Sequence, residues 1–107
     1  VEAKLLVENN FLRLRPKFLA KEYVGDKGMN KYISGIYKQQ GCMLGYIVEG
    51  KIEKIVEKIN NEVIYFFDSN QILSKYTSSN FVHNGIYRSF HKEGLKYPMF
   101  HLMLDFN

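Results

Sequence analysis

The chain is poor in cysteine and has no long apolar run. Cys42 is the only cysteine among 107 residues, so no disulfide can form within the chain. This is typical of proteins from a reducing compartment, and we expect a cytoplasmic location. No apolar run approaches the roughly 18 residues that a membrane-spanning helix needs, and no signal-peptide pattern is visible. We therefore expect no membrane partner, and we interpret Cys42, within GCMLGYIV, as a small buried apolar residue.

The composition is that of a single globular domain. Hydrophobic residues make up 46% and charged residues 24% of the chain, which is ordinary for a folded protein of this size. The sequence starts at Val1 and not at a methionine. We therefore expect residues 1–107 to be one domain that forms the truncated C-terminal part of a larger one.

The net charge of +4 is unevenly distributed. The first forty residues hold eight basic side chains against four acidic ones, whereas residues 41–107 hold seven of each. The eight are Lys4, Arg13, Arg15, Lys17, Lys21, Lys27, Lys31 and Lys38. A basic stretch suits a polyanionic partner, most commonly nucleic acid; a solvated lysine-rich surface is the alternative.

Strand and helix patterns alternate along the chain. Residues 1–8 read as a strand with Val1, Ala3 and Leu5 on the core face, and FLRLR as a short strand that ends at Pro16. Residues 19–28 read as a loop, and residues 28–39 as a helix that Asp26 could cap. The segment 41–50 reads as a strand covered on both faces.

The second half contains the clearest helix. Apolar residues in 51–63 recur at helical spacing from Ile52 to Val63. The last strand carries a strongly apolar face of Phe100, Leu102, Leu104 and Phe106. This order predicts an α/β fold with a small mixed β-sheet flanked by helices.

The opening VEAK places an acid and a lysine on one face of a strand. Residues two apart on a strand point the same way, with Cα atoms about 7 Å apart. A carboxylate there can ligate Mg²⁺ or Mn²⁺. A lysine can position an attacking water and offset the charge that develops on a phosphate. Glu2 and Lys4 thus match the requirements of metal-assisted phosphodiester hydrolysis, and the alternative is an exposed cross-strand charge pair.

At this point the chain resembles the PD-(D/E)XK nuclease superfamily, which has the restriction-endonuclease-like fold. The resemblance spans roughly residues 1–60 and rests on VEAK, EYVGDKGMNKYISGIY and GCMLGYIVEG. It implies a central strand carrying the E-x-K element, with Glu2 as the second acidic metal ligand and Lys4 as the catalytic lysine. It also implies a first acidic ligand on a preceding strand, which would lie before Val1. A magnesium-dependent endonuclease, with a role in restriction or phage defence, requires that ligand.

Further basic residues could hold the DNA backbone. Arg13, Arg15 and Lys17 alternate along FLRLRPK and could follow phosphates or protect an edge strand. Lys31 and Lys38 lie on the expected helix 28–39. A non-catalytic module that binds nucleic acid or protein stays the alternative to a nuclease, and a homodimer is possible.

Histidines in the second half have weaker interpretations. His83, Arg88 and His91 cluster in FVHNGIYRSFH and could bind phosphate, although surface loop positions explain them better. The spacing of His83 and His91 matches no zinc motif. We expect His101 to be a hydrogen-bonded, half-buried histidine.

Overall fold

The described strands form one mixed sheet with helices on one side. The computed structural model describes residues 2–9, 20–34, 41–76, 85–91 and 98–106. The elements in chain order are β1 (Glu2–Val7), α1 (Ala20–Val24), α2 (Asn30–Ile33), β2 (Cys42–Glu49), α3 (Ile52–Phe66), the 3-10 helix η2 (Ser69–Gln71), β3 (Ser74–Lys75), β4 (Ile86–Ser89) and β5 (Met99–Asp105). The expected mixed α/β architecture is therefore confirmed.

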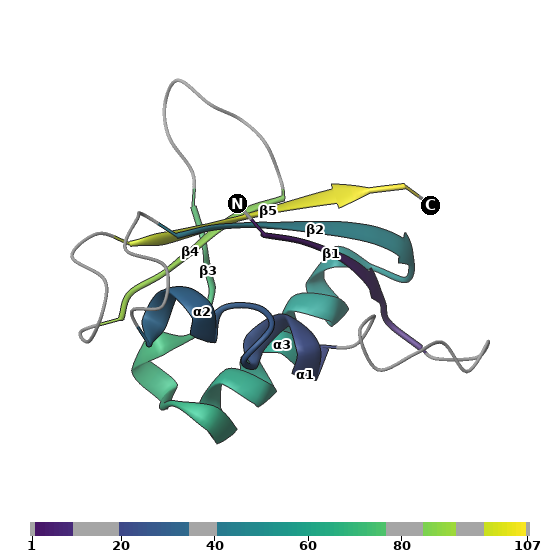
Figure 1. The fold of residues 1–107 in the computed structure, drawn as a ribbon. Helices are drawn as coiled ribbons and strands as arrows, with labels where there is room; N and C mark the ends of the chain where they lie inside the picture. The colour runs from purple at the N-terminus through teal and green to yellow at the C-terminus, as the bar shows by residue number, and fades with distance from the viewer. Residues whose placement is uncertain (1, 10–19, 35–40, 77–84, 92–97, 107) are drawn as a thin grey trace.

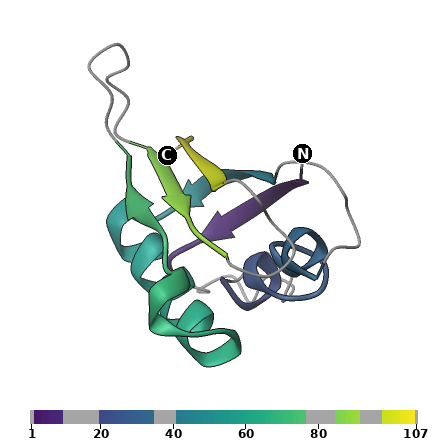
Figure 2. The same cartoon turned by 90° about the vertical axis from the view of Figure 1, so that its left-hand side faces the viewer.

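The five strands lie in the order β1-β2-β5-β4-β3. β1 and β5 each run parallel to β2, while β4 runs antiparallel to both β5 and β3. β1 forms one edge of this described sheet, whereas the nuclease resemblance places the E-x-K element on a central strand. Helices α1, α2 and α3 all lie on one face of the sheet (Figures 1 and 2).

The core lies between that face and the helices. From the sheet it takes Leu6, Met43, Ile47, Met99 and Met103, each at most 1% exposed. The helices contribute fully or almost fully buried side chains: Tyr23, Val24, Tyr32, Ile55, Ile59 and Val63. Gly45 belongs to the same face, because a Cβ there would lie 2.5 Å from Met103 Sδ. A side chain at this position would push the core apart.

The predicted core faces of β1 and β5 were wrong. Ala3 and Leu5 are exposed while Leu6 is buried, and β5 buries Met99, His101 and Met103 in place of its more apolar alternate residues. Both faces of these strands carry apolar side chains, so alternation alone could not decide which one the helices cover. Described helices likewise cover only one face of β2, and Cys42 on its other face is half-buried.

Helix α3 confirms the strongest sequence pattern. It begins within one residue of the expected range and continues three residues past Val63, with Ile55, Val56, Ile59 and Val63 buried. Gly50 precedes it with φ at +100°, a backbone conformation that favours glycine. The Cβ of any other residue there would also lie 2.1 Å from Glu8 Cβ.

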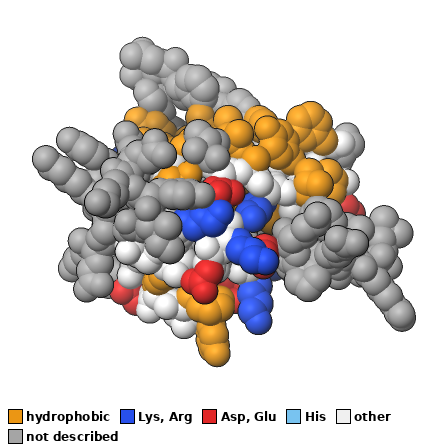
Figure 3. Space-filling model, viewed as in Figure 1, with side chains coloured by type: hydrophobic (Ala, Val, Ile, Leu, Met, Phe, Trp, Pro, Cys, Tyr) orange, Lys and Arg blue, Asp and Glu red, His pale blue; other side chains and the backbone are white. Residues whose placement is uncertain are grey.

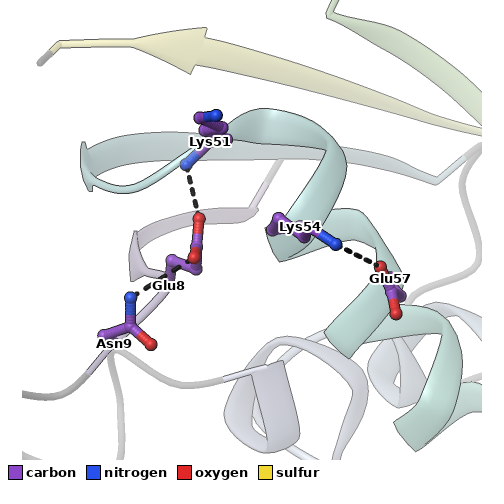
Figure 4. Close-up of polar contacts among 5 residues, drawn as sticks. All are labelled: Glu8, Asn9, Lys51, Lys54 and Glu57. Carbon is purple, nitrogen blue, oxygen red and sulfur yellow. Dashed lines mark hydrogen bonds and ion pairs between the residues drawn. The ribbon is translucent and has the colours of Figure 1, made fainter.

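Hydrogen bonds connect the end of β1 to the start of α3. The Glu8 carboxylate accepts a hydrogen bond from the Lys51 backbone N–H at 2.9 Å (Figure 4), and Lys58 Nζ donates to the Glu8 carbonyl. Asn9 N–H donates to Glu49 Oε1 at 2.7 Å. The hydrogen bond from the Lys51 backbone holds the pKa of Glu8 below its ordinary value. The hydrogen bond from Asn9 and the charges of Lys58 and Lys51 lower this pKa by smaller amounts.

The segment before β2 differs from its prediction. Residues 20–24 form helix α1 where a loop was expected, because Tyr23 and Val24 are completely buried and this packing outweighs local propensity. The described part of the expected helix 28–39 is helical only at α2, while residues 35–40 lie outside the described part. Asp26 does not cap it; its carboxylate accepts from the Asn30 side chain at 2.7 Å.

In the described part of the chain, no helix is long and apolar enough to span a membrane.

Candidate functional site

Glu2 and Lys4 project from the helix-covered face of β1. Both side chains are partly buried, while Ala3 between them points to the open side of the sheet. On β2, Met43 is the register partner of Glu2 and Gly45 that of Lys4. The predicted shared face is therefore present. The expectation that Ala3 faces the core was wrong, since the acid and the lysine themselves lie on the core side.

Helix α2 brings a second lysine to Glu2. Lys31 Nζ lies 2.8 Å from Glu2 Oε1, and the two side chains are only 26% and 20% exposed. Lys31 was predicted to hold a DNA phosphate, but the structure places its ammonium group on the carboxylate of the E-x-K strand. Figure 3 shows basic and acidic side chains gathered on the side of the molecule where β1, α1 and α2 lie. No local sequence pattern predicts this pairing, because 29 positions separate the two residues.

Four other basic residues were predicted to hold the DNA backbone. Arg13, Arg15, Lys17 and Lys38 lie outside the described residues. Lys4 makes no hydrogen bond or ion pair with another residue in the described part.

The carboxylate of Glu2 fits one position of a hard-metal site. Mg²⁺ is bound through one or two carboxylates and completes its shell with waters and substrate phosphates. Within the described ranges, no three His, Cys, Asp or Glu side chains gather as a metal-binding group. Glu2 would therefore supply one ligand, and the other ligands would have to come from water, substrate or further acidic groups.

A second polar cluster lies in the core on the same helix-covered face of the sheet, toward the edge formed by β4 and β3. Tyr23 Oη lies 2.7 Å from His101 Nδ1, and Ser89 Oγ lies 2.8 Å from His101 Nε2 and 2.7 Å from His91 Nε2. His91 Nδ1 lies 2.6 Å from Gln71 Oε1, and Gln71 Nε2 lies 3.0 Å from Asp68 Oδ2. We call this chain from Tyr23 to Asp68 the histidine relay.

The Asp68 carboxylate at one end of the relay determines the direction of every hydrogen bond in it. The ionised Asp68 carboxylate only accepts, so Gln71 Nε2 donates to it and Gln71 Oε1 accepts from His91 Nδ1–H. His91 Nε2 then accepts from the Ser89 hydroxyl, and Ser89 Oγ in turn accepts from His101 Nε2–H. Tyr23 donates to His101 Nδ1. All donors and acceptors are matched only when both imidazoles are neutral.

Burial holds both imidazoles in that neutral state. Burial and, to a smaller extent, the neighbouring His91 lower the pKa of His101 to about 3. Burial also lowers the pKa of His91 to about 4, although the negative charge of Asp68 acts in the opposite direction. Burial also raises the pKa of the Tyr23 hydroxyl well above its ordinary value.

Ser89 and His91 resemble a catalytic nucleophile and base, but a substrate could not reach them. Ser89 and His91 have the spacing of a nucleophile and its base, yet Ser89 is fully buried and its hydroxyl already bonds both imidazoles. We therefore interpret the relay as structural: it connects α1, β5, β4 and η2. His101 satisfies the expectation of a hydrogen-bonded histidine, although it is fully buried.

The surface-loop interpretation was wrong for His91 and Arg88. His91 is 3% exposed, and Arg88 lies on β4 with its guanidinium 4.8 Å from the Tyr76 ring centre and 5.1 Å from that of Phe90. His83 lies outside the described residues. The available signal for the relay was the alternate placement of polar residues: Ser89 and His91 stand on either side of Phe90, and His101 stands between Phe100 and Leu102.

Comparison with protein-family models, with curated proteins and with solved structures finds no match for this chain.

Proposed function

We propose that this domain hydrolyses phosphodiester bonds of DNA in the cytoplasm with the help of Mg²⁺ or Mn²⁺. The observation that carries the proposal is the arrangement of Glu2, Lys4 and Lys31 at one end of the sheet. The Glu2 carboxylate on β1 is paired there with Lys31 of α2, and Lys4 projects, partly buried, from the same face of β1. Ammonium groups beside a metal-binding carboxylate can stabilise the negative charge that develops on a phosphate in the transition state.

Each of the three side chains has a role in this proposal. Glu2 is one metal ligand, and the bound metal supplies Lewis acidity and a water of lowered pKa. Lys4 orients the attacking water and offsets charge on the phosphate. Lys31 holds Glu2 in place in the absence of metal, and its ammonium group can turn to a phosphate oxygen when the carboxylate is engaged elsewhere.

The distribution of charge supports DNA as the substrate. The excess of basic residues lies in the same forty residues that contain Glu2 and Lys4. Arg13, Arg15, Lys17 and Lys38 are the proposed backbone contacts, and each would weaken binding to all sequences alike when removed. Such contacts also make the affinity fall steeply as salt rises.

A non-catalytic nucleic-acid-binding module is the second candidate. The observation in its favour is that the Glu2 carboxylate is engaged by Lys31 at 2.8 Å and has no neighbouring acids that complete a metal group among the described residues. In that case Lys31 neutralises Glu2, and the remaining lysines hold phosphates without chemistry.

The test is cleavage of a fluorescently labelled DNA duplex in Mn²⁺ and in Mg²⁺. Wild type is compared with Glu2→Gln and Lys4→Ala, and Lys54→Ala serves as the control because Lys54 is an exposed lysine of α3. We expect the two site variants to lose at least about 100-fold in rate, a typical cost of removing a group that stabilises the transition state, and the control to cleave like wild type. Circular dichroism verifies folding.

Two outcomes contradict the nuclease proposal. Binding of the duplex without cleavage by wild type supports the non-catalytic module. Cleavage at equal rates by wild type and both site variants leaves Glu2 and Lys4 as a charge pair and excludes their proposed roles.

A further inference from the structure

We infer that two copies of this chain associate through the face of the sheet opposite the helices. This surface, the open face, has no described helix over it (Figures 1 and 2). Its apolar members come from four neighbouring strands and their ends: Ala3, Leu5, Leu44, Tyr46, Val48, Ile86, Phe100, Leu102, Leu104 and Phe106.

The strand register makes these side chains one continuous surface. Leu5, Tyr46 and Leu104 are register partners across β1, β2 and β5, and Ala3, Leu44, Leu102 and Ile86 form the adjacent row. The Phe106 ring extends the first row, with its centre 5.6 Å from that of Tyr46. Figure 3 shows apolar side chains in a band along the side of the molecule that carries the sheet.

Among the described residues, charged side chains lie at the margin of this face. Arg88 is opposite Phe100 in the register, and its guanidinium is stacked on Tyr76 and Phe90. The rows through Leu5 and Ala3 contain no charged side chain. A nucleic-acid or strongly charged protein partner would find no complementary groups there, whereas an identical apolar surface requires none.

The exposed area is sufficient for a small dimer interface. Leu5, Val48 and Phe106 expose 42%, 44% and 63% of their surface. At about 180 Å² for a large apolar residue they contribute roughly 270 Å². The half-buried members of the face add about as much, giving roughly 500 Å², near the upper limit for an uncovered patch on a monomer. Two copies face to face would bury about 1,000 Å², the lower limit for a specific interface.

The geometry of two such sheets is compatible with closed symmetry. Two identical faces related by a two-fold axis form a self-complementary contact and leave no further copy of the surface exposed. Sheets packed face to face in this way form the sandwich arrangement, with strands aligned to within about 30°. The Glu2 and Lys4 side chains lie on the opposite face of the sheet, so association leaves them accessible, and this inference does not depend on the proposed function.

The test measures the mass of the full chain in solution by light scattering over a wide concentration series. Leu5→Lys introduces a charge at the β1 end of the row formed by Leu5, Tyr46 and Leu104. Ile64→Lys is the matched control, because Ile64 is 49% exposed on helix α3, on the other side of the sheet. We expect wild type and Ile64→Lys to reach twice the monomer mass of 12.6 kDa. Leu5→Lys should need at least tenfold more protein to do so.

Monomeric wild type at every concentration overturns the inference, and so does a Leu5→Lys variant that dimerises as readily as the control. If Leu5→Lys does not fold, Phe106→Ser provides the same comparison, because Phe106 follows β5 and is 63% exposed. Loss of dimerisation in either folded variant, with the control unchanged, supports the open face as the interface.

Discussion

Ser89 occupies a position inside the core where its hydroxyl must both donate and accept. It accepts from His101 and donates to His91, so replacing it with alanine leaves a buried N–H and a buried ring nitrogen without partners. We predict that Ser89→Ala lowers the free energy of unfolding by about 1–3 kcal/mol, the usual cost of unsatisfied buried polar groups.

Urea denaturation measures this loss, and Ser74→Ala is the matched control. Ser74 lies on neighbouring β3 and is exposed, so its variant should change stability by less than about 0.5 kcal/mol. Equal stability of the two variants would show that the relay contributes nothing to the fold.

At the scale of elements, the ion pair between Glu2 and Lys31 connects β1 to α2. We predict a coupling free energy of about 1 kcal/mol in a double-mutant cycle with Glu2→Gln and Lys31→Met, since the pair is short and largely shielded from water. The exposed pair of Lys54 and Glu57 on α3, at 3.6 Å (Figure 4), should couple by only about 0.2–0.5 kcal/mol. A coupling no larger for Glu2–Lys31 than for Lys54–Glu57 contradicts the proposed role of Lys31 in holding Glu2.

The elements differ in how much of them the sequence could predict. Helix α3 was predictable because its apolar residues recur at a spacing that only a helix places on one side, and its charged residues occupy the opposite side. Strands β1, β2 and β5 were predictable as strands, but their buried faces were not, since Leu5 or Leu104 is as apolar as Leu6 or Met103. Helix α1 was missed because Tyr23 and Val24 are helical through burial against α3 and not through local propensity.

The candidate site was predictable to the same limited extent. The spacing of Glu2 and Lys4 places them on one face of any strand, and the structure agrees. The contact with Lys31 depends on how α2 packs against β1, which no local pattern specifies. The relay depends on register, because Ser89 and His101 meet only through the pairing of β4 with β5.

For the whole molecule, the relay predicts a loss of stability in mild acid. The pKa values of His91 and His101, about 4 and about 3 in the folded state, lie below the ordinary value of 6.5. The unfolded chain therefore binds more protons as the pH falls below 6.5, and stability declines until the folded imidazoles titrate near 4 and 3. Glu8 adds to this loss as the pH falls through its ordinary pKa of 4.5, since its pKa is lowered in the folded state.

Urea denaturation of wild type and His91→Gln at several pH values between 4.5 and 6.5 isolates the contribution of His91, because Glu8 is the same in both proteins. Wild type should lose stability across this window, and His91→Gln should show a slope smaller by about one proton. An unchanged slope in His91→Gln would mean that His91 titrates normally in the folded protein.

The most direct measurement of the central claim is the rate of DNA cleavage in Mn²⁺ by wild type and by Lys4→Ala at equal concentrations. The account predicts cleavage by wild type and a loss of at least about 100-fold in the folded variant. Equal rates in the two proteins, or no cleavage by wild type, would contradict the assignment of Glu2 and Lys4 to phosphodiester hydrolysis.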